Sequence, residues 1–367
     1  MKRVLSLLLV LILAMGVLAG CSSNEPATPA EPSQPEAPVE EPAEEPTETP
    51  AEGGQKLGLG HVISMAKSRD AGTDANGNPV LAQAQVDVTA GSVLFDSEGK
   101  VLSVFIDVAQ TRVAFDADMA VTTDKTVEAK TKKDLGPDYG MARASGIQKE
   151  WFEQIAALED WMVGKTVDEI KGMGLEEGKT TEEDLVSSVT ITVTDYIAVV
   201  EQAWAEAIEA EGAVKAGLGV KTSIAKSRDA GTDANGNPVL AQAQVDTVLS
   251  AVAFDADDNV AGAVIDTAQV RVAFDEEGVV TTDRAGEFKT KNELAGDYGM
   301  LRASGIQKEW FEQAEALATW MVGKSVAEIT GMGLEEGKTT EEDLVSSVTV
   351  TVTDYLDVVA EAFEVSK

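Results

Sequence analysis

Two long segments of this chain carry nearly the same sequence. Residues 58–206 align with residues 217–365 at a constant offset of 159, without gaps and with about two thirds of the positions identical. Because the period is long and only two copies are present, the pattern predicts a tandem pair of complete domains and not a solenoid. We place repeat 1 at 56–212 and repeat 2 at 213–367.

Residues 1–20 have the pattern of an export signal. Lys2 and Arg3 form a positive head, residues 4–18 are almost wholly apolar, and Leu-Ala-Gly-Cys ends at Cys21. The apolar stretch is too short for a membrane span. Its end resembles the lipobox of bacterial lipoproteins, which implies lipidation of Cys21 and a lipid anchor on the extracytoplasmic face of the cell membrane. The alternative is an ordinary secretory signal with an incidental cysteine.

Residues 21–55 predict a disordered tether. Eight of the 11 prolines and nine glutamates fall in this segment. Such a composition cannot bury a core, and the like charges extend the chain. The tether would hold the two repeats away from the membrane.

A β-hairpin is predicted in each repeat. In repeat 1, residues 84–95 and 101–115 are rich in Val, Phe, Ile and Ala, and the turn signal Asp-Ser-Glu-Gly-Lys lies between them. An amphipathic helix should follow, with Ser145 as its cap. Its apolar face holds residues at helical spacing: Ile147, Trp151, Ile155, Leu158 and Met162.

The end of each repeat also favours helices. Thr166 to Glu169 has the sequence of a capping box, as does Thr180 to Glu183, and a last helix is expected over 195–210. Residues 188–194 fit either a strand or a helix start. Strands followed by helices indicate an α+β fold, with an antiparallel sheet and packed helices in each copy.

Composition excludes several functions. The net charge is -35, from 64 acidic and 29 basic residues, so no nucleic-acid partner is expected. The only histidine, His61, corresponds to Val220 in repeat 2, so histidine chemistry is not shared by the repeats. A hydrolase is disfavoured for that reason, and no metal site is predicted. The loop with Asp74, Asn76 and Asn78 imitates half of a Ca²⁺ loop but has Pro79 where glycine is due.

A hydroxyl-rich segment occurs in both repeats as Asp-Leu-Val-Ser-Ser-Val-Thr, at 184–190 and 343–349. It resembles the attachment motif of flavin mononucleotide (FMN)-binding domains, in which a flavin transferase esterifies the last hydroxyl with FMN. Ser-Val replaces the Gly-Ala of that family. The resemblance implies that Thr190 and Thr349 are acceptors. It also implies a set of cofactor-binding residues: Asp184, Ser187, Asp343 and Ser346.

The resemblance implies a lipid-anchored flavoprotein that carries electrons and is a redox carrier more than an enzyme. Its partners would be the membrane, the flavin transferase, and redox donors and acceptors. Tyr139 and Tyr298 are candidates for a ligand face, whereas Arg143 and Arg302 are more typical of surface ion pairs. The alternative function is a cofactor-free surface lipoprotein that binds a ligand or another protein.

Overall fold

We describe the fold from a computed structural model, in which residues 54–367 are described. They belong to one compact unit, Pro50–Lys367. The predicted signal, Cys21 and nearly all of the tether lie outside the described residues. None of the helices in the described part is long and apolar enough to span a bilayer.

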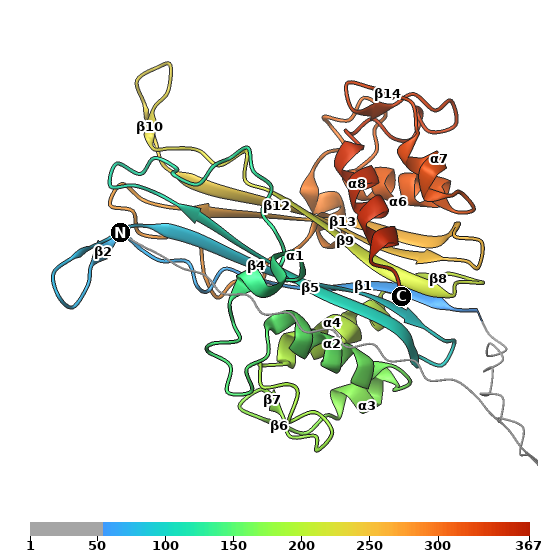
Figure 1. The fold of residues 1–367 in the computed structure, drawn as a ribbon. Coiled ribbons are helices and arrows are strands. Elements are labelled where there is room, and N and C mark those ends of the chain that lie inside the picture. The colour runs from blue at the N-terminus through green and yellow to red at the C-terminus, as the bar shows by residue number, and fades with distance from the viewer. Residues whose placement is uncertain (1–53) are drawn as a thin grey trace, which may run out of the picture. The chain divides into compact units, whose positions relative to one another are not determined.

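The two repeats have matching elements (Figure 1). Repeat 1 contains β1 Lys56–Ser64, β2 Gly72–Thr73, β3 Pro79–Val80, β4 Gln83–Phe95, β5 Val101–Ala114, α1 Lys132–Leu135, the 3-10 helix η1 Gly136–Tyr139, α2 Trp151–Met162, α3 Val167–Lys171, β6 Leu175–Glu176, β7 Lys179–Thr180, α4 Thr194–Ala205 and β8 Ile208–Glu209. Repeat 2 contains β9 Lys215–Ser223, β10 Gly231–Thr232, β11 Pro238–Val239, β12 Gln242–Phe254, β13 Val260–Ala273, α5 Lys291–Leu294, η2 Ala295–Tyr298, α6 Trp310–Met321, α7 Val326–Thr330, β14 Leu334–Glu335, β15 Lys338–Thr339 and α8 Thr353–Glu364.

The fold is α+β with antiparallel sheets, as predicted. One main sheet has the order β5-β4-β1-β8 and the other the order β13-β12-β9. The predicted hairpin is β4–β5, in which Gln83 pairs with Ala114 and Phe95 pairs with Val101. β12 and β13 repeat this pairing in the second copy.

The two sheets pack face to face and share one hydrophobic core. That core includes Val86 and Val113 from repeat 1 together with Val245 and Val270 from repeat 2. Alternating small apolar residues on both inner faces allow this packing. The repeats are therefore joined by a common core, although each also has its own.

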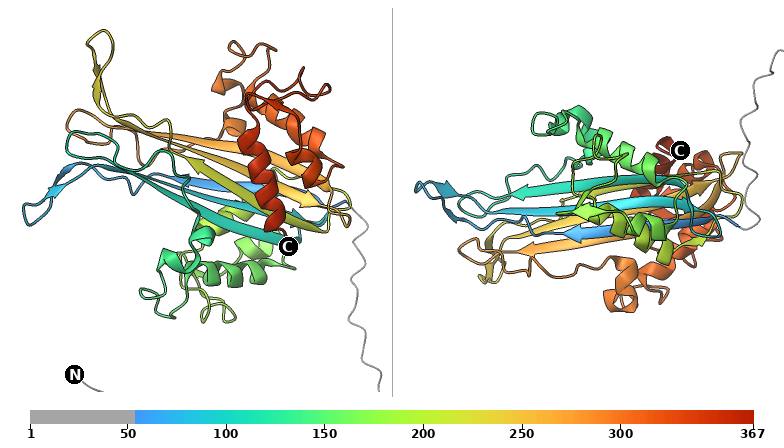
Figure 2. Two further views of the ribbon diagram at one scale, coloured as in Figure 1. Left: turned by 45° about the horizontal axis from the view of Figure 1, so that its top comes forward. Right: turned by 90° about the horizontal axis from the view of Figure 1, so that it is seen from below.

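Helices cover the outer face of each sheet (Figures 1 and 2). In repeat 1 they form a core between α2, α4 and the sheet, centred on Trp151 and Ile155. In repeat 2 the equivalent core contains Trp310 and Leu317. The result is four layers in the order helix, sheet, sheet, helix.

Two helix boundaries differ from those predicted. The amphipathic helix begins at Trp151 and not near Ser145, because Gln148 has φ +55°, which a right-handed helix cannot contain. The last helix begins at Thr194 and ends at Ala205. Ile208 and Glu209 then pair with Leu57 and Lys56 as a short edge strand.

Of the two capping boxes predicted for repeat 1, one forms in the structure and the other does not. The box at Thr166 is confirmed, because its hydroxyl accepts from the N–H of Glu169 and the Glu169 carboxylate accepts from the N–H of Thr166. The segment after Thr180 is a turn. Residues 188–193 form neither a strand nor a helix.

Candidate functional site

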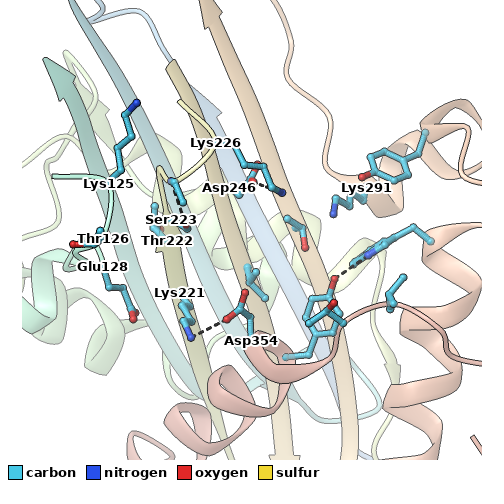
Figure 3. Close-up of a pocket in the computed structure, with 18 of the residues that line it drawn as sticks. Lys125, Thr126, Glu128, Lys221, Thr222, Ser223, Lys226, Asp246, Lys291 and Asp354 are labelled. Carbon is cyan, nitrogen blue, oxygen red and sulfur yellow. Dashed lines mark hydrogen bonds and ion pairs between the residues drawn. The ribbon is translucent and has the colours of Figure 1, made fainter. Parts of the chain in front are cut away.

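A cavity of about 590 Å³ lies on the helix side of the second sheet (Figure 3). Its floor comes from β9, β12 and β13, and its walls come from α5, η2 and the start of α6 and α8. Residues 125–128 of repeat 1 also line it, so both repeats contribute to one site. Cavities of this size commonly hold a small molecule or cofactor.

Lys291 provides an unpaired positive charge in this pocket. Its ammonium lies 5.1 Å from the ring centre of Tyr298 and 4.9 Å from that of Trp310. No carboxylate of the described residues lies within ion-pair distance of it. Burial lowers the pKa of Lys291 to about 8. An anion in the cavity would restore its charge balance.

The other lysines of the pocket already have carboxylate partners. Lys221 lies 2.8 Å from Asp354 and 2.6 Å from Asp357. Lys226 lies 2.9 Å from Asp246, as drawn in Figure 3. Lys125 contacts an aspartate outside the pocket. Lys291 is therefore the pocket lysine with charge left for a ligand.

Aromatic side chains give the pocket a rigid wall. The indole N–H of Trp310 donates to the hydroxyl of Tyr355 at 2.9 Å, and both side chains are almost fully buried. Burial raises the pKa of Tyr355 to about 12. The buried hydroxyl of Thr267, on β13, makes no hydrogen bond of normal geometry but lies near enough to the Tyr355 hydroxyl to oppose the rise of its pKa. The Trp310–Tyr355 hydrogen bond therefore fixes the position of this wall.

The equivalent surface of repeat 1 has the same wall but a different floor. Lys132, Tyr139 and Trp151 repeat the arrangement, with the Lys132 ammonium 5.1 Å from both ring centres. Lys221 and Thr267, however, correspond to Val62 and Val108. The polar floor is thus a property of repeat 2.

The segment that lies over the pocket also differs between the two repeats. The N–H of Ala129 donates to the carbonyl of Thr222 at 3.3 Å, which ties the end of residues 125–128 to β9. The equivalents of these two residues are Phe288 and Ile63, larger side chains that pack against the shared core. A small residue at 129 leaves room in the pocket of repeat 2.

Each predicted acceptor threonine is hydrogen-bonded to the helix that begins with the wall tryptophan of its own repeat, and neither threonine lines the Lys291 pocket. The N–H of Thr349 donates to the side-chain carbonyl of Gln313 at 2.8 Å, and its hydroxyl is 3.3 Å from the same oxygen. Thr190 makes the same contacts with Gln154. Val350, the residue after Thr349, lines the pocket.

The other predicted motif residues do not reach the pocket. Four side chains lie on the exposed turn before the threonines: Asp184, Ser187, Asp343 and Ser346. Asp343 borders a separate hollow on the outer side of α6. Val348, at the position where the family has alanine, is buried in the core of repeat 2.

Remaining candidates from the sequence fall into two groups. Tyr298 lines the pocket, as expected of a ligand face, and Tyr139 lines a shallower hollow in repeat 1. Arg143 and Arg302 are exposed and lie outside the pocket. The importance of Lys291 was not predicted, although the capping sequence Thr-Lys-Asn-Glu at 290–293, which fixes its position, was available as a signal.

The Ca²⁺-like loop is organised by its own aspartate. The Asp74 carboxylate accepts from the N–H groups of Asn76 and Asn78, both at 2.8 Å, and from the Asn78 side chain at 3.0 Å. These bonds lower the pKa of Asp74. Within residues 54–367, no group of three or more acidic, histidine or cysteine side chains is arranged to hold a metal ion.

Comparisons with known proteins give one partial similarity. No protein-family description and no solved structure matches the chain. A part of the chain is similar to the chlorophenol reductase of Desulfitobacterium hafniense, at 30% identity over 97 residues. The match covers 23% of this chain, and the chain spans 30% of the length of that reductase.

Proposed function

We propose that this protein is a lipid-anchored, extracytoplasmic redox carrier whose second repeat holds FMN in the Lys291 pocket. The observation that carries the proposal is the unpaired Lys291 ammonium beside Tyr298 and Trp310 in a cavity of about 590 Å³. FMN combines a flat aromatic ring system with a phosphate. The similarity of one part of the chain to a reductase is consistent with a redox role.

The described residues fit the two ends of FMN. Lys291 would pair with the anionic phosphate or with negative charge on the ring, and the aromatic wall would lie along the ring. When bound, the flavin supplies the electron-transfer chemistry, and the protein sets its orientation and surroundings.

Covalent attachment would take place at Thr349. The Thr349 hydroxyl would lose its proton and form a bond to the FMN phosphorus of a flavin dinucleotide donor, whose pyrophosphate bond breaks so that a nucleoside monophosphate leaves. Gln313 holds this hydroxyl at 3.3 Å and fixes its orientation. Redox donors and acceptors would be the remaining partners.

A second candidate is a carrier or binding protein with a non-covalent ligand in the same pocket. The burial of Val348 favours it, because the tight Gly-Ala turn of the family is replaced by a branched side chain that belongs to the core. A flavin held only by Lys291 and the aromatic wall would satisfy this account. So would another anionic aromatic ligand without redox activity.

The test is an absorption spectrum and an intact mass of the protein purified from a host with a flavin transferase. We expect flavin absorption that remains with the protein after denaturation, and the mass increase of one FMN phosphoester. Flavin that is lost on denaturation supports the non-covalent account. A colourless protein of unmodified mass, to which added FMN does not bind, would overturn the proposal.

Matched variants locate the flavin. Thr349→Ala should abolish covalent attachment, whereas Thr190→Ala should leave it in place. Lys291→Gln should lower the affinity for FMN at least tenfold in the non-covalent case, and Lys132→Gln is its control in repeat 1. Equal effects of Lys291→Gln and Lys132→Gln would contradict a site in repeat 2.

A further inference from the structure

A second cavity in repeat 2, of about 460 Å³, lies between β13 and α6 and is separate from the Lys291 pocket. Most of its lining side chains are small or apolar, among them Gly262, Ala263, Ala314 and Ala318. Ile208 of repeat 1 also lines it. Neither the flavin proposal nor any motif of the sequence uses this cavity.

The equivalent place in repeat 1 is filled. Glu159, only 1% exposed, lies 2.7 Å from the ammonium of Lys133 and 2.8 Å from that of Lys367. The ring of Phe105 lies beneath the Lys133 ammonium, 3.3 Å from it. Ile155 is fully buried beside them.

Each of the filling residues is reduced in repeat 2. Ala318 stands where repeat 1 has Glu159, Val264 where it has Phe105, and Ala314 where it has Ile155. Lost side-chain volume in a core normally appears as a cavity, since the surroundings collapse only in part. Compared with repeat 1, repeat 2 lacks the phenyl ring of Phe105, the branched chain of Ile155 and the linear chain of Glu159.

The charges have been removed together with the volume. Asn292 replaces Lys133, and its side-chain N–H donates to the carbonyl of Ile265 at 2.9 Å. The carboxylates nearest to the cavity, those of Glu209 and Glu315, belong to exposed residues at its rim. Glu209 is paired with Lys56 at 3.6 Å. The interior therefore has no counter-charge for an ion.

We propose that this cavity binds a neutral, apolar small molecule that takes the place of the phenyl and aliphatic groups found in repeat 1. An apolar hollow favours such a ligand, because apolar surface of both the ligand and the protein is removed from water and new van der Waals contacts form. No lysine or arginine lines this cavity to pair with an anion, so its ligand differs from that of the Lys291 pocket. Repeat 2 would thus have two binding sites, one for an anionic ligand and one for a neutral, apolar ligand.

The test uses the neutral fluorophore N-phenyl-1-naphthylamine with the full chain. We expect saturable binding with increased fluorescence. Ala314→Ile, which restores the residue of repeat 1, should weaken binding at least tenfold. Val264→Phe is the second filling variant in case the first does not fold. Thermal unfolding followed by circular dichroism checks that each variant is folded.

The controls separate this site from the first pocket. Lys291→Gln should leave binding of the fluorophore unchanged, and added FMN should not displace it. Binding that survives both filling variants, or no binding up to the solubility limit of the fluorophore, would overturn the proposal. It would also be overturned if sedimentation showed a dimer that the filling variants dissociate, since a second copy would then be the occupant.

Discussion

The carboxylate of Glu361 accepts a hydrogen bond from the backbone N–H of Val220 at 3.0 Å. In repeat 1 the amide of Gln202 occupies the same place and accepts from the N–H of His61 at 2.7 Å. One copy thus uses a titratable group where the other uses a neutral one. Burial, with smaller contributions from Asp134 and other carboxylates of repeat 1, raises the pKa of Glu361 to about 7.

This difference predicts a pH dependence of stability. Between about pH 4.5 and 7 the folded protein retains a proton on Glu361 that the unfolded chain releases. Its contribution to the free energy of unfolding is therefore complete below pH 4.5 and is lost as the pH rises to 7. Glu361→Gln should be as stable as the natural protein at pH 4 and more stable at pH 8.

Urea unfolding at several pH values measures this effect. Glu364→Gln, an exposed position on the same helix, is the control and should leave the pH profile unchanged. If Glu361→Gln keeps the pH profile of the natural protein, Glu361 does not titrate as described.

The buried charges around Glu159 give a second prediction. Glu159→Ala removes the partner of Lys133 and the acceptor of the Ile106 N–H, which donates to it at 2.6 Å. Breaking a buried pair on one side typically costs about 3–5 kcal/mol. The double variant Lys133→Asn with Glu159→Ala recreates the Asn292 and Ala318 of repeat 2, and it should recover part of the loss.

A double-mutant cycle based on chemical unfolding checks this coupling. The single variant Lys133→Asn completes the cycle. Additive losses in the double variant would mean that the two side chains do not stabilise each other.

Two glycines of β1 allow α4 to lie directly on the sheet. A methyl group at Gly58 would overlap the carbonyl of Ala203, and one at Gly60 would overlap the carbonyl of Val199. Gly60→Ala should therefore destabilise the fold by about 1–3 kcal/mol or more through overpacking.

Gly72→Ala is the matched control for that substitution. Nothing lies within 4 Å of the methyl group that it would add. Thermal unfolding should give a lower melting temperature for Gly60→Ala than for Gly72→Ala. Equal melting temperatures would show that the close approach of α4 does not limit the size of the side chain at residue 60.

The Trp310–Tyr355 hydrogen bond gives a fourth prediction. Tyr355→Phe leaves the buried indole N–H without its acceptor, which should cost about 1–3 kcal/mol. Tyr196→Phe removes the equivalent bond to Trp151, also 2.9 Å long. Comparable losses in chemical unfolding are expected for the two variants, and stability unchanged in both would show that the bond contributes nothing.

Local features were predictable wherever a short stretch of sequence controls the backbone. The hairpin β4–β5 follows from apolar strands around a polar turn, and the Thr166 capping box forms within four residues. The start of α2 was placed too early because helical spacing extends back to Ile147. The positive φ of Gln148 that interrupts the spacing has no such signal in the sequence.

The candidate site was predictable only in part. Tyr298 was expected to face a ligand and does line the pocket, whereas Asp343 and Ser346 lie on an exposed turn. Lys291 gains its lowered pKa from burial among Trp310, Tyr298 and the strands, which are distant in sequence. Burial depends on the packed chain, so the sequence pattern did not reveal it.

The sequence by itself determined the duplication, the α+β class and the residue differences between the copies. Only the tertiary structure decided that the two sheets share one core and that residues of repeat 1 line a pocket in repeat 2. It also decided that Ala314 and Ala318 border a cavity in repeat 2, whereas Ile155 and Glu159 are buried at the equivalent place in repeat 1. The physical reason is that hydrogen bonds and periodicity act over a few residues, whereas packing and desolvation depend on which distant surfaces meet.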